Sequence, residues 1–225
     1  MMLTRSSLLG LNMKPNEQLR TLLREAYGPC PFFGRCREAV WAPESGHIPR
    51  GYLGATRALA DVELVMVFSE PGSPHQGERY DSSLGEDLLI DACSEHAYQS
   101  FRDGSDLFHR NVRWFLSQVY PESTFDEQLQ KVWLTEGRLC SIKDEIAGTM
   151  DRTCAQHYLT GQLALVSQAT IVAFGQKARR YLDGLGAEYV PAYSLAPPGA
   201  NHKPARPSWE AAIDLVKSKR LSRFK

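Results

Sequence analysis

The segment Val62–Phe68, with the sequence VELVMVF, constrains the fold more than any other part of the chain. It is apolar almost throughout, as expected for a strand buried on both faces, and such strands are typical of parallel sheets. A polar loop, Ser69-Glu70-Pro71-Gly72, follows it directly. Because parallel strands need long crossover connections that cover the sheet with helices, this segment predicts an α/β fold.

Three further apolar segments have the length and composition of strands. They are Lys131–Thr135, Ala169–Gly175 and Glu188–Tyr193, and the last contains a proline that favours the sheet edge. Helical spacing of apolar residues predicts helices around them. The predicted helices are Glu17–Tyr27, Asp106–Tyr120, Met150–Val166, Gln176–Leu182 and Ser208–Lys219. We therefore predict one α/β domain over residues 1–225, with a central four-stranded, mainly parallel sheet and helices on both faces.

Local signals add detail to this fold. Asp106 and Ser208 are expected to be helix N-caps, with Glu210 near the positive end of the last helix. The segment Cys30–Gly54 contains many Gly and Pro residues, so we expect it to form an ordered arm over the core.

The composition of the 225-residue chain is that of a folded protein. Hydrophobic residues make up 43% and charged residues 23%, which excludes disordered, collagen-like and disulfide-scaffold classes. No apolar run approaches the ~20 residues that a membrane-spanning helix needs, and the first ten residues hold only a short apolar patch. We expect a soluble, cytoplasmic monomer without a membrane partner.

Charge gives only a local argument for nucleic-acid binding. The chain has 26 Lys and Arg residues and 26 Asp and Glu residues. Residues 201–225 are the exception, because seven basic residues outnumber two acidic ones, for a net charge of +5. Such a segment fits contact with phosphates, and it fits a solvated helix end as well.

Four of the five cysteines form two pairs in the sequence. Cys30 and Cys36 have five residues between them, and Cys140 and Cys154 have thirteen. Four thiolates can hold an iron–sulfur cluster or a structural zinc ion. Four unconnected, partly buried thiols are an equally good interpretation of the spacing. Cys93 lies apart from both pairs, and we expect no role for it.

Two residues near predicted strand or helix ends are candidates for catalysis. Glu70 follows the first strand, where its carboxylate can orient water as a base. His202 precedes the last helix and can donate a hydrogen bond to developing negative charge. Solvated surface residues are the alternative for both. The other histidines considered, His75, His96, His109 and His157, are expected to be structural or exposed.

These segments, in this order, resemble the iron–sulfur branch of the uracil-DNA glycosylase superfamily along nearly the whole chain. Val65–Gly72 resembles the family's first strand and its Gly-Glu-Ala-Pro-Gly motif, and Val132–Cys140 resembles its second strand, loop and cluster cysteine. Cys154–Leu159 resembles the next cluster cysteine with its helix, and Ile171–Ala178 resembles the third strand and the helix after it.

The resemblance implies a DNA glycosylase that hydrolyses the bond between deoxyribose and a flipped-out uracil or other deaminated base, in base excision repair. Glu70 would orient the water, and His202, with Lys203, would stabilise the departing base. Pro204–Trp209 would insert into the duplex. The implied substrate-binding residues are Ser69, Pro71, Gly72, Tyr80, Glu136, Asn201 and Lys203, with Tyr80 stacking on the base. Cys30, Cys36, Cys140 and Cys154 would hold a 4Fe-4S cluster, with structural zinc or no metal as alternatives.

The chain also departs from the family pattern. The loop Ser69–Gly72 is one residue shorter than the family motif, and the first cysteine pair is more widely spaced. The last motif is Asn201-His202-Lys203-Pro204 rather than His-Pro, and Glu136 replaces the asparagine that commonly reads uracil. If Glu136 is ionised, it only accepts hydrogen bonds, which favours bases that present amino or imino donors. This predicts a substrate other than uracil, or a loss of activity.

Two other classes of function remain open on the sequence. The first is a catalytically inactive iron–sulfur protein of the same fold that binds nucleic acid. The second is a zinc-stabilised α/β domain that acts on a small nucleotide, which the neutral overall charge favours.

Overall fold

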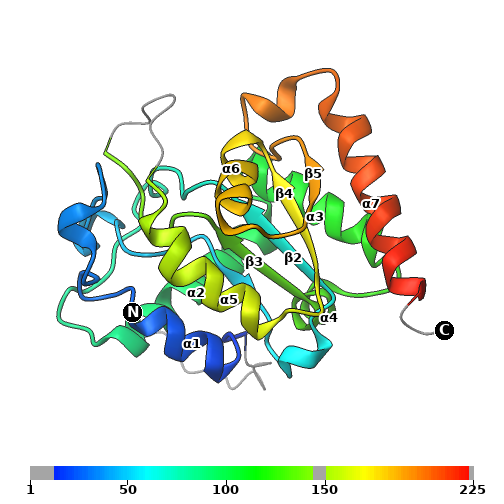
Figure 1. Cartoon of the computed structure of the whole chain (residues 1–225). Helices are drawn as coiled ribbons and strands as arrows, with labels where there is room; N and C mark the ends of the chain where they lie inside the picture. Colours follow the sequence, from blue (N-terminus) through cyan, green and yellow to red (C-terminus); the bar gives the residue numbers. More distant parts are fainter. Residues whose placement is uncertain (1–12, 144–150, 223–225) are drawn as a thin grey trace.

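The computed structural model describes residues 13–143 and 151–222. In this part of the chain, a five-stranded sheet of order β1-β3-β2-β4-β5 occupies the centre (Figure 1). The strands are β1 (Leu53–Gly54), β2 (Leu64–Phe68), β3 (Val132–Glu136), β4 (Thr170–Phe174) and β5 (Val190–Ala192). The pairs β2–β3, β2–β4 and β4–β5 are parallel, whereas β1 and β3 are antiparallel. The α/β class and the mainly parallel sheet are confirmed.

The prediction of four strands is wrong, because β1 adds a fifth. This strand lies within the arm Cys30–Gly54 and covers only two residues. Leu53 pairs with Leu134, and Gly54 pairs with Trp133. The strand predicted at Glu188–Tyr193 is β5 and does lie at the opposite edge of the sheet.

Helices cover both faces of the sheet, as predicted. The longer ones are α1 (Glu17–Arg24), α2 (Glu86–Asp103), α3 (Leu107–Val119), α4 (Phe125–Lys131), α5 (Thr160–Leu165), α6 (Gln176–Leu185) and α7 (Ala205–Ser222). A π-helical turn, η4 (Ala155–Leu159), leads into α5, and 3₁₀ turns occur at η1 (Phe33–Arg35), η2 (Pro43–Ser45), η3 (Leu59–Asp61) and η5 (Gly199–Asn201).

The central strand β2 is buried on both sides because its residues alternate between two apolar clusters. Val65 and Val67 pack in the cluster that contains residues of α1, α2, η4 and α6. Leu64, Met66 and Phe68 pack in the cluster that contains residues of α3, α4 and α7. The sheet is therefore the middle layer of three, which leaves the carboxyl ends of its strands as the place where a ligand can approach.

The helix starts confirm one predicted cap and correct another. The Asp106 carboxylate accepts a hydrogen bond from the His109 backbone N–H at 2.9 Å and caps α3. The last helix begins at Ala205, so Ser208 is not its N-cap. The Ser208 hydroxyl instead accepts a hydrogen bond from the Tyr193 N–H at 2.8 Å and ties α7 to the chain after β5. Glu210, placed near the helix start, forms an ion pair with Arg206 at 3.1 Å.

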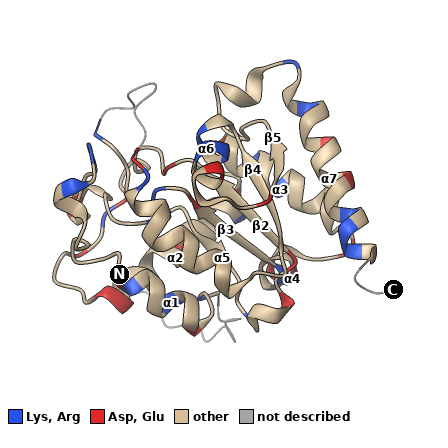
Figure 2. Cartoon of the chain, viewed as in Figure 1, with Lys and Arg blue, Asp and Glu red and all other residues tan. Residues whose placement is uncertain are grey.

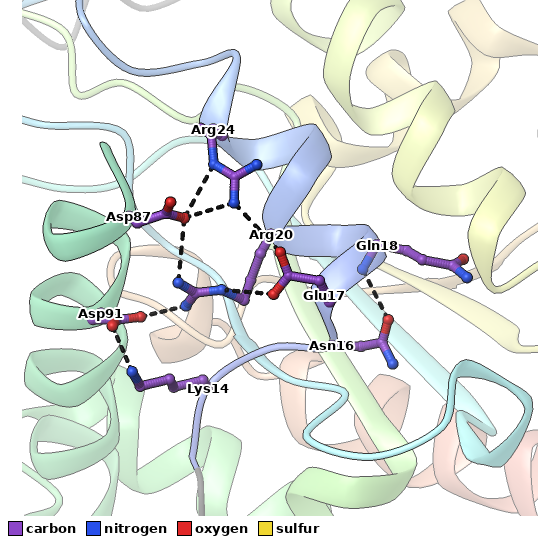
Figure 3. Close-up of polar contacts among 8 residues, drawn as sticks. All are labelled: Lys14, Asn16, Glu17, Gln18, Arg20, Arg24, Asp87 and Asp91. Atoms are coloured by element: carbon purple, nitrogen blue, oxygen red, sulfur yellow. Dashed lines mark hydrogen bonds and ion pairs between the residues drawn. The ribbon is translucent and has the colours of Figure 1, made fainter. Parts of the chain in front are cut away.

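An ion-pair network fastens α1 to α2 (Figure 3). Arg20, which is 8% exposed, contacts Asp91 and lies 3.3 Å from Asp87. Arg24 reaches Asp87 at 2.8 Å, and Lys14 reaches Asp91 at 2.6 Å. The network fixes the first half of α2 against α1, and the second half of α2 continues towards the strand ends.

The basic C-terminal segment is partly used within the fold. Figure 2 shows Lys and Arg positions, in blue, towards the end of α7. Arg220 forms an ion pair with Glu63 at 2.5 Å, and its guanidinium lies 4.3 Å from the Tyr120 ring centre. Part of the positive charge in residues 201–225 is therefore structural. Met150 of the predicted helix, the first ten residues, and Arg223 and Lys225 lie outside the described residues. Among the described helices, none has the length and apolarity required to cross a membrane.

Candidate active site

A cavity of about 530 Å³ opens at the carboxyl ends of the parallel strands. Phe68 at the end of β2, Glu136 at the end of β3 and Phe174 at the end of β4 all line it. Open α/β sheets bind ligands at this edge, and the volume is in the range of small-ligand pockets. The cavity is therefore the candidate active site.

Six of the predicted catalytic and substrate-binding residues line this cavity. They are Ser69, Glu70, Pro71, Gly72, Tyr80 and Glu136. The remaining three, Asn201, His202 and Lys203, are exposed and do not line it. Asn201 ends η5 and the other two follow it, whereas the neighbouring part of the cavity wall is formed by Ser194, Ala196 and Pro197. The structure thus brings Glu70 and Glu136 together and leaves His202 outside the cavity.

Glu70 forms an ion pair at the edge of the cavity. Its side chain is 8% exposed, and Lys177 in the first turn of α6 donates a hydrogen bond to its Oε1 at 2.5 Å. The Phe68 carbonyl accepts a hydrogen bond from the Gly137 N–H at 2.9 Å, and the Ser69 carbonyl accepts one from the Arg138 N–H at 3.0 Å. The chain that leads into Glu70 is therefore fixed, as a positioned base requires.

Glu136 is a buried acid of a different kind. It is 5% exposed, and its Oε2 has no hydrogen-bond partner among the described residues. Burial raises the pKa of Glu136 well above its usual value, and the negative charge of Glu70 raises it further, against an opposing effect of Arg50. These effects favour a protonated Glu136, whereas the sequence-based argument assumed an ionised one. A protonated carboxyl has an O–H donor and a carbonyl acceptor, as an asparagine amide also has a donor and an acceptor. The argument that Glu136 disfavours uracil, whose edge presents carbonyl oxygens and one imino N–H, no longer applies.

Gly51 makes room for the Glu136 side chain. Its φ is +86°, and a Cβ atom placed on it would lie 2.4 Å from Glu136 Cγ. We expect Gly51→Ala to lower the free energy of unfolding by about 2–4 kcal/mol, because it combines left-handed backbone strain with overpacking. Chemical denaturation measures this. Gly34→Ala is the matched control, since nothing lies within 4 Å of its Cβ position, and a similar loss there would contradict the explanation.

A polar network forms another wall of the cavity. Arg50 contacts the Gly72 carbonyl, lies 3.2 Å from the Ser141 hydroxyl and forms an ion pair with Glu78 at 3.4 Å. The Tyr80 hydroxyl donates to Glu78 Oε1 at 2.8 Å. Burial is the main reason that the pKa of Tyr80 is raised, so the phenol is neutral. The sequence singled out Tyr80 but missed the Arg50–Glu78 pair that orients it.

Three histidines also line the cavity, which corrects the expectation that they are structural or exposed. His75 follows the Ser69–Gly72 loop, His96 lies on α2, and His109 lies on α3. Glu78 and Asp106 lie among them. No spacing in the sequence indicates this group, because its members come from one loop and two helices.

The two cysteine pairs approach each other through the arm. The Val40 N–H donates to the Ser141 carbonyl at 3.0 Å, and Ala39 forms a β-bridge with Ile142. Cys140 is 7% exposed, and Cys154 accepts a hydrogen bond from the Leu139 N–H at 3.3 Å. Loop residues that are 100 positions apart in the sequence are thereby joined next to the cysteines.

The electrostatics of the four thiols show that they are neighbours. Burial is the largest cause that raises the pKa of Cys140, and the charges of Cys154, Cys36 and Cys30 raise it further, while Arg138 lowers it. Burial likewise raises the pKa of Cys154 to about 12, with further contributions from Cys36 and Cys30. Bound iron or zinc would remove these thiol protons, because a coordinating thiol is deprotonated. A backbone N–H donor to sulfur is also a typical feature around clusters.

The spacing of the cysteine sulfurs can be compared with that of a structural zinc site. A tetrahedral zinc ion with Zn–S bonds of ~2.3 Å places its sulfurs about 4 Å apart. Among the described residues, no three cysteine sulfurs all lie within 4.8 Å of one another. The described cysteines therefore do not form a preformed single-ion site.

The chain matches no protein-family model, and no similar sequence is found among curated proteins.

Proposed function

We propose that this protein is a DNA glycosylase that hydrolyses the N-glycosidic bond of uracil or another deaminated base flipped out of DNA, as a step in base excision repair. The observation that carries the proposal is the pair of carboxyl groups in one cavity. Glu70 forms an ion pair with Lys177, and burial raises the pKa of Glu136 well above its usual value. Two carboxyl groups with opposite protonation states are the arrangement used to hydrolyse glycosidic bonds.

The ionised Glu70 would act on the sugar side of the bond. Its carboxylate would orient a water molecule towards the sugar carbon and accept a proton from it. The same negative charge would stabilise the positive charge that develops on the sugar as the bond to the base breaks. The hydrogen bond from Lys177 Nζ to Glu70 Oε1, at 2.5 Å, keeps the Glu70 side chain in place.

The neutral Glu136 would act on the base. Glu136 lines the cavity, and its Oε2 has no hydrogen-bond partner among the described residues, so its O–H would donate a hydrogen bond to the base as it leaves with negative charge. This role was predicted for His202, which is exposed outside the cavity. In the proposal, Asn201, His202 and Lys203 contact the DNA beside the cavity instead, together with the start of α7.

Aromatic side chains would hold the base by its faces. Tyr80 lines the cavity and is 7% exposed. Phe68 and Phe108 line it too, with ring centres 5.0 Å apart. Stacking on such rings does not depend on the hydrogen-bonding pattern of the base, so Glu136 and its neighbours would decide which base is accepted.

The test is an excision assay on duplexes and single strands that each contain one uracil, hypoxanthine or xanthine. We expect an abasic product, revealed by strand cleavage in alkali, from at least one of these substrates. DNA binding without any abasic product would overturn the proposal and favour the inactive binding protein. Weak DNA binding that hardly depends on salt, with no product, would favour the small-nucleotide hypothesis.

The same proposal assigns a 4Fe-4S cluster to Cys30, Cys36, Cys140 and Cys154. We expect protein purified without oxygen to be brown and to contain iron and sulfide in equal amounts. Cys140→Ser should remove the visible absorption, because the cluster loses a thiolate. Cys93→Ser is the matched control, since Cys93 is also buried but lies on α2. A colourless wild-type protein, or one that carries only zinc, would contradict the assignment.

A further inference from the structure

The histidine group in the cavity has no part in the proposed hydrolysis. His75 is shared by two sets of side chains, each with three potential ligand atoms within 4.8 Å of one another. One set is His75, Glu78 and His96, and the other is His75, Asp106 and His109. Two imidazoles and a carboxylate are a common donor set for divalent transition-metal ions.

The His75 and His96 rings lie close together, and one ring nitrogen of His96 is buried. The ring centres of His75 and His96 are 5.7 Å apart with the planes tilted by 53°. His96 Nε2 is shielded from solvent and has no hydrogen-bond partner within residues 13–143 and 151–222, although Glu78 Oε2 lies 3.5 Å away. A buried imidazole nitrogen without a partner is costly unless something binds it.

The carboxylates of both sets already have partners, but they differ in how deeply they are buried. The Asp106 carboxylate caps α3 and also lies 2.8 Å from His109 Nδ1, and its side chain is 49% exposed. The Glu78 side chain is 3% exposed and is held by the Tyr80 hydroxyl and the His75 N–H, both at 2.8 Å. Hydrogen bonds that orient a carboxylate are the usual second layer around a metal ligand.

We propose that His75, Glu78 and His96 form a binding site for one divalent transition-metal ion of the zinc class. Three protein ligands leave a coordination position free, as in catalytic rather than structural sites. Because the site lies in the cavity wall, this position is available to water or to an oxygen atom of the substrate. His109 and Asp106 flank the site without binding the ion.

The test is a titration of the purified protein with Zn²⁺ alone, followed by calorimetry. The wild type should bind one more ion than His75→Ala, His96→Ala and Glu78→Gln do, or should bind it at least tenfold more tightly. Zinc bound at the cysteines would be present in all of these proteins, so it does not change the difference in bound zinc between the wild type and the variants. His109→Ala is the matched control, because it removes a neighbouring imidazole, and it should bind zinc as the wild type does.

Two results would overturn the proposal. The first is equal zinc binding by the wild type and the His75→Ala variant. The His75 side chain is 37% exposed, so it can be removed with little effect on the core. The second is loss of binding in His109→Ala but not in His96→Ala, which would assign the ion to the other set. Circular dichroism spectra of all variants show whether each is folded. The titration measures no excision, so it is independent of the proposed glycosylase activity.

Discussion

Glu70→Gln is expected to reduce the rate of base excision by about 10²–10⁴-fold. The amide keeps the volume of the side chain, but it cannot accept a proton from water and carries no negative charge for the developing positive charge on the sugar. Single-turnover kinetics with enzyme in excess measure the chemical step. The binding of uncleaved substrate should change much less, because Glu70 acts mainly on the transition state.

Glu63→Gln is the matched control for this prediction. Glu63 lies just before β2, whereas Glu70 follows it, and it too belongs to a largely buried ion pair, with Arg220 at 2.5 Å. The control therefore removes a comparable charge far from the cavity. We expect near wild-type excision from it. Equal rates for the wild type and Glu70→Gln, or equal losses in both variants, would contradict a catalytic role for Glu70.

The parallel strands were predictable because strands buried on both faces have apolar sequences. Every residue of β2 and β3 is buried, so both strands appear as apolar segments of strand length. The strand β1 is only two residues long and depends on pairing with Leu134 and Trp133, which no local pattern encodes. Long-range pairing of this kind becomes visible only in the folded chain.

The long helix α2 was missed for a related reason. Its buried side chains include Ser94 and Ser100, while Leu88 is 54% exposed. The apolar periodicity is therefore weak, and the helix is fixed by tertiary contacts such as the Arg20–Asp91 pair. The helix α4 has only seven residues and begins with a capping box of Thr124 and Glu127, a signal that the sequence does contain.

Part of the candidate site could likewise be predicted from the sequence, and part could not. Glu70 and Glu136 were predictable because residues at the ends of parallel strands meet at one edge of the sheet. The histidine group was not, because His75, His96 and His109 meet only through the packing of α2 and α3. The protonation state of Glu136 was also inaccessible, because it depends on burial and on the charge of Glu70 rather than on residue type.

The rate of excision should fall at alkaline pH, by about tenfold for each pH unit above the raised pKa of Glu136. Only the protonated carboxyl can donate a hydrogen bond to the departing base. Glu136→Gln keeps a donor and an acceptor but has no proton to lose in this range. We expect the variant to retain excision at pH 9 better, relative to its own rate at pH 6, than the wild type does. Rates measured from pH 5 to 10 with both proteins decide this.

The same ionisation must appear in the pH dependence of folding. Above the ordinary pKa of 4.5 the unfolded chain loses the Glu136 proton, whereas the folded chain keeps it up to the raised pKa. The folded state then binds more protons, so the free energy of unfolding falls with rising pH by about 1.4 kcal/mol per unit within that window. Glu136→Gln should remove this slope and make the protein more stable than the wild type at neutral pH. Parallel pH profiles for the two proteins, in folding and in excision, would contradict a neutral Glu136.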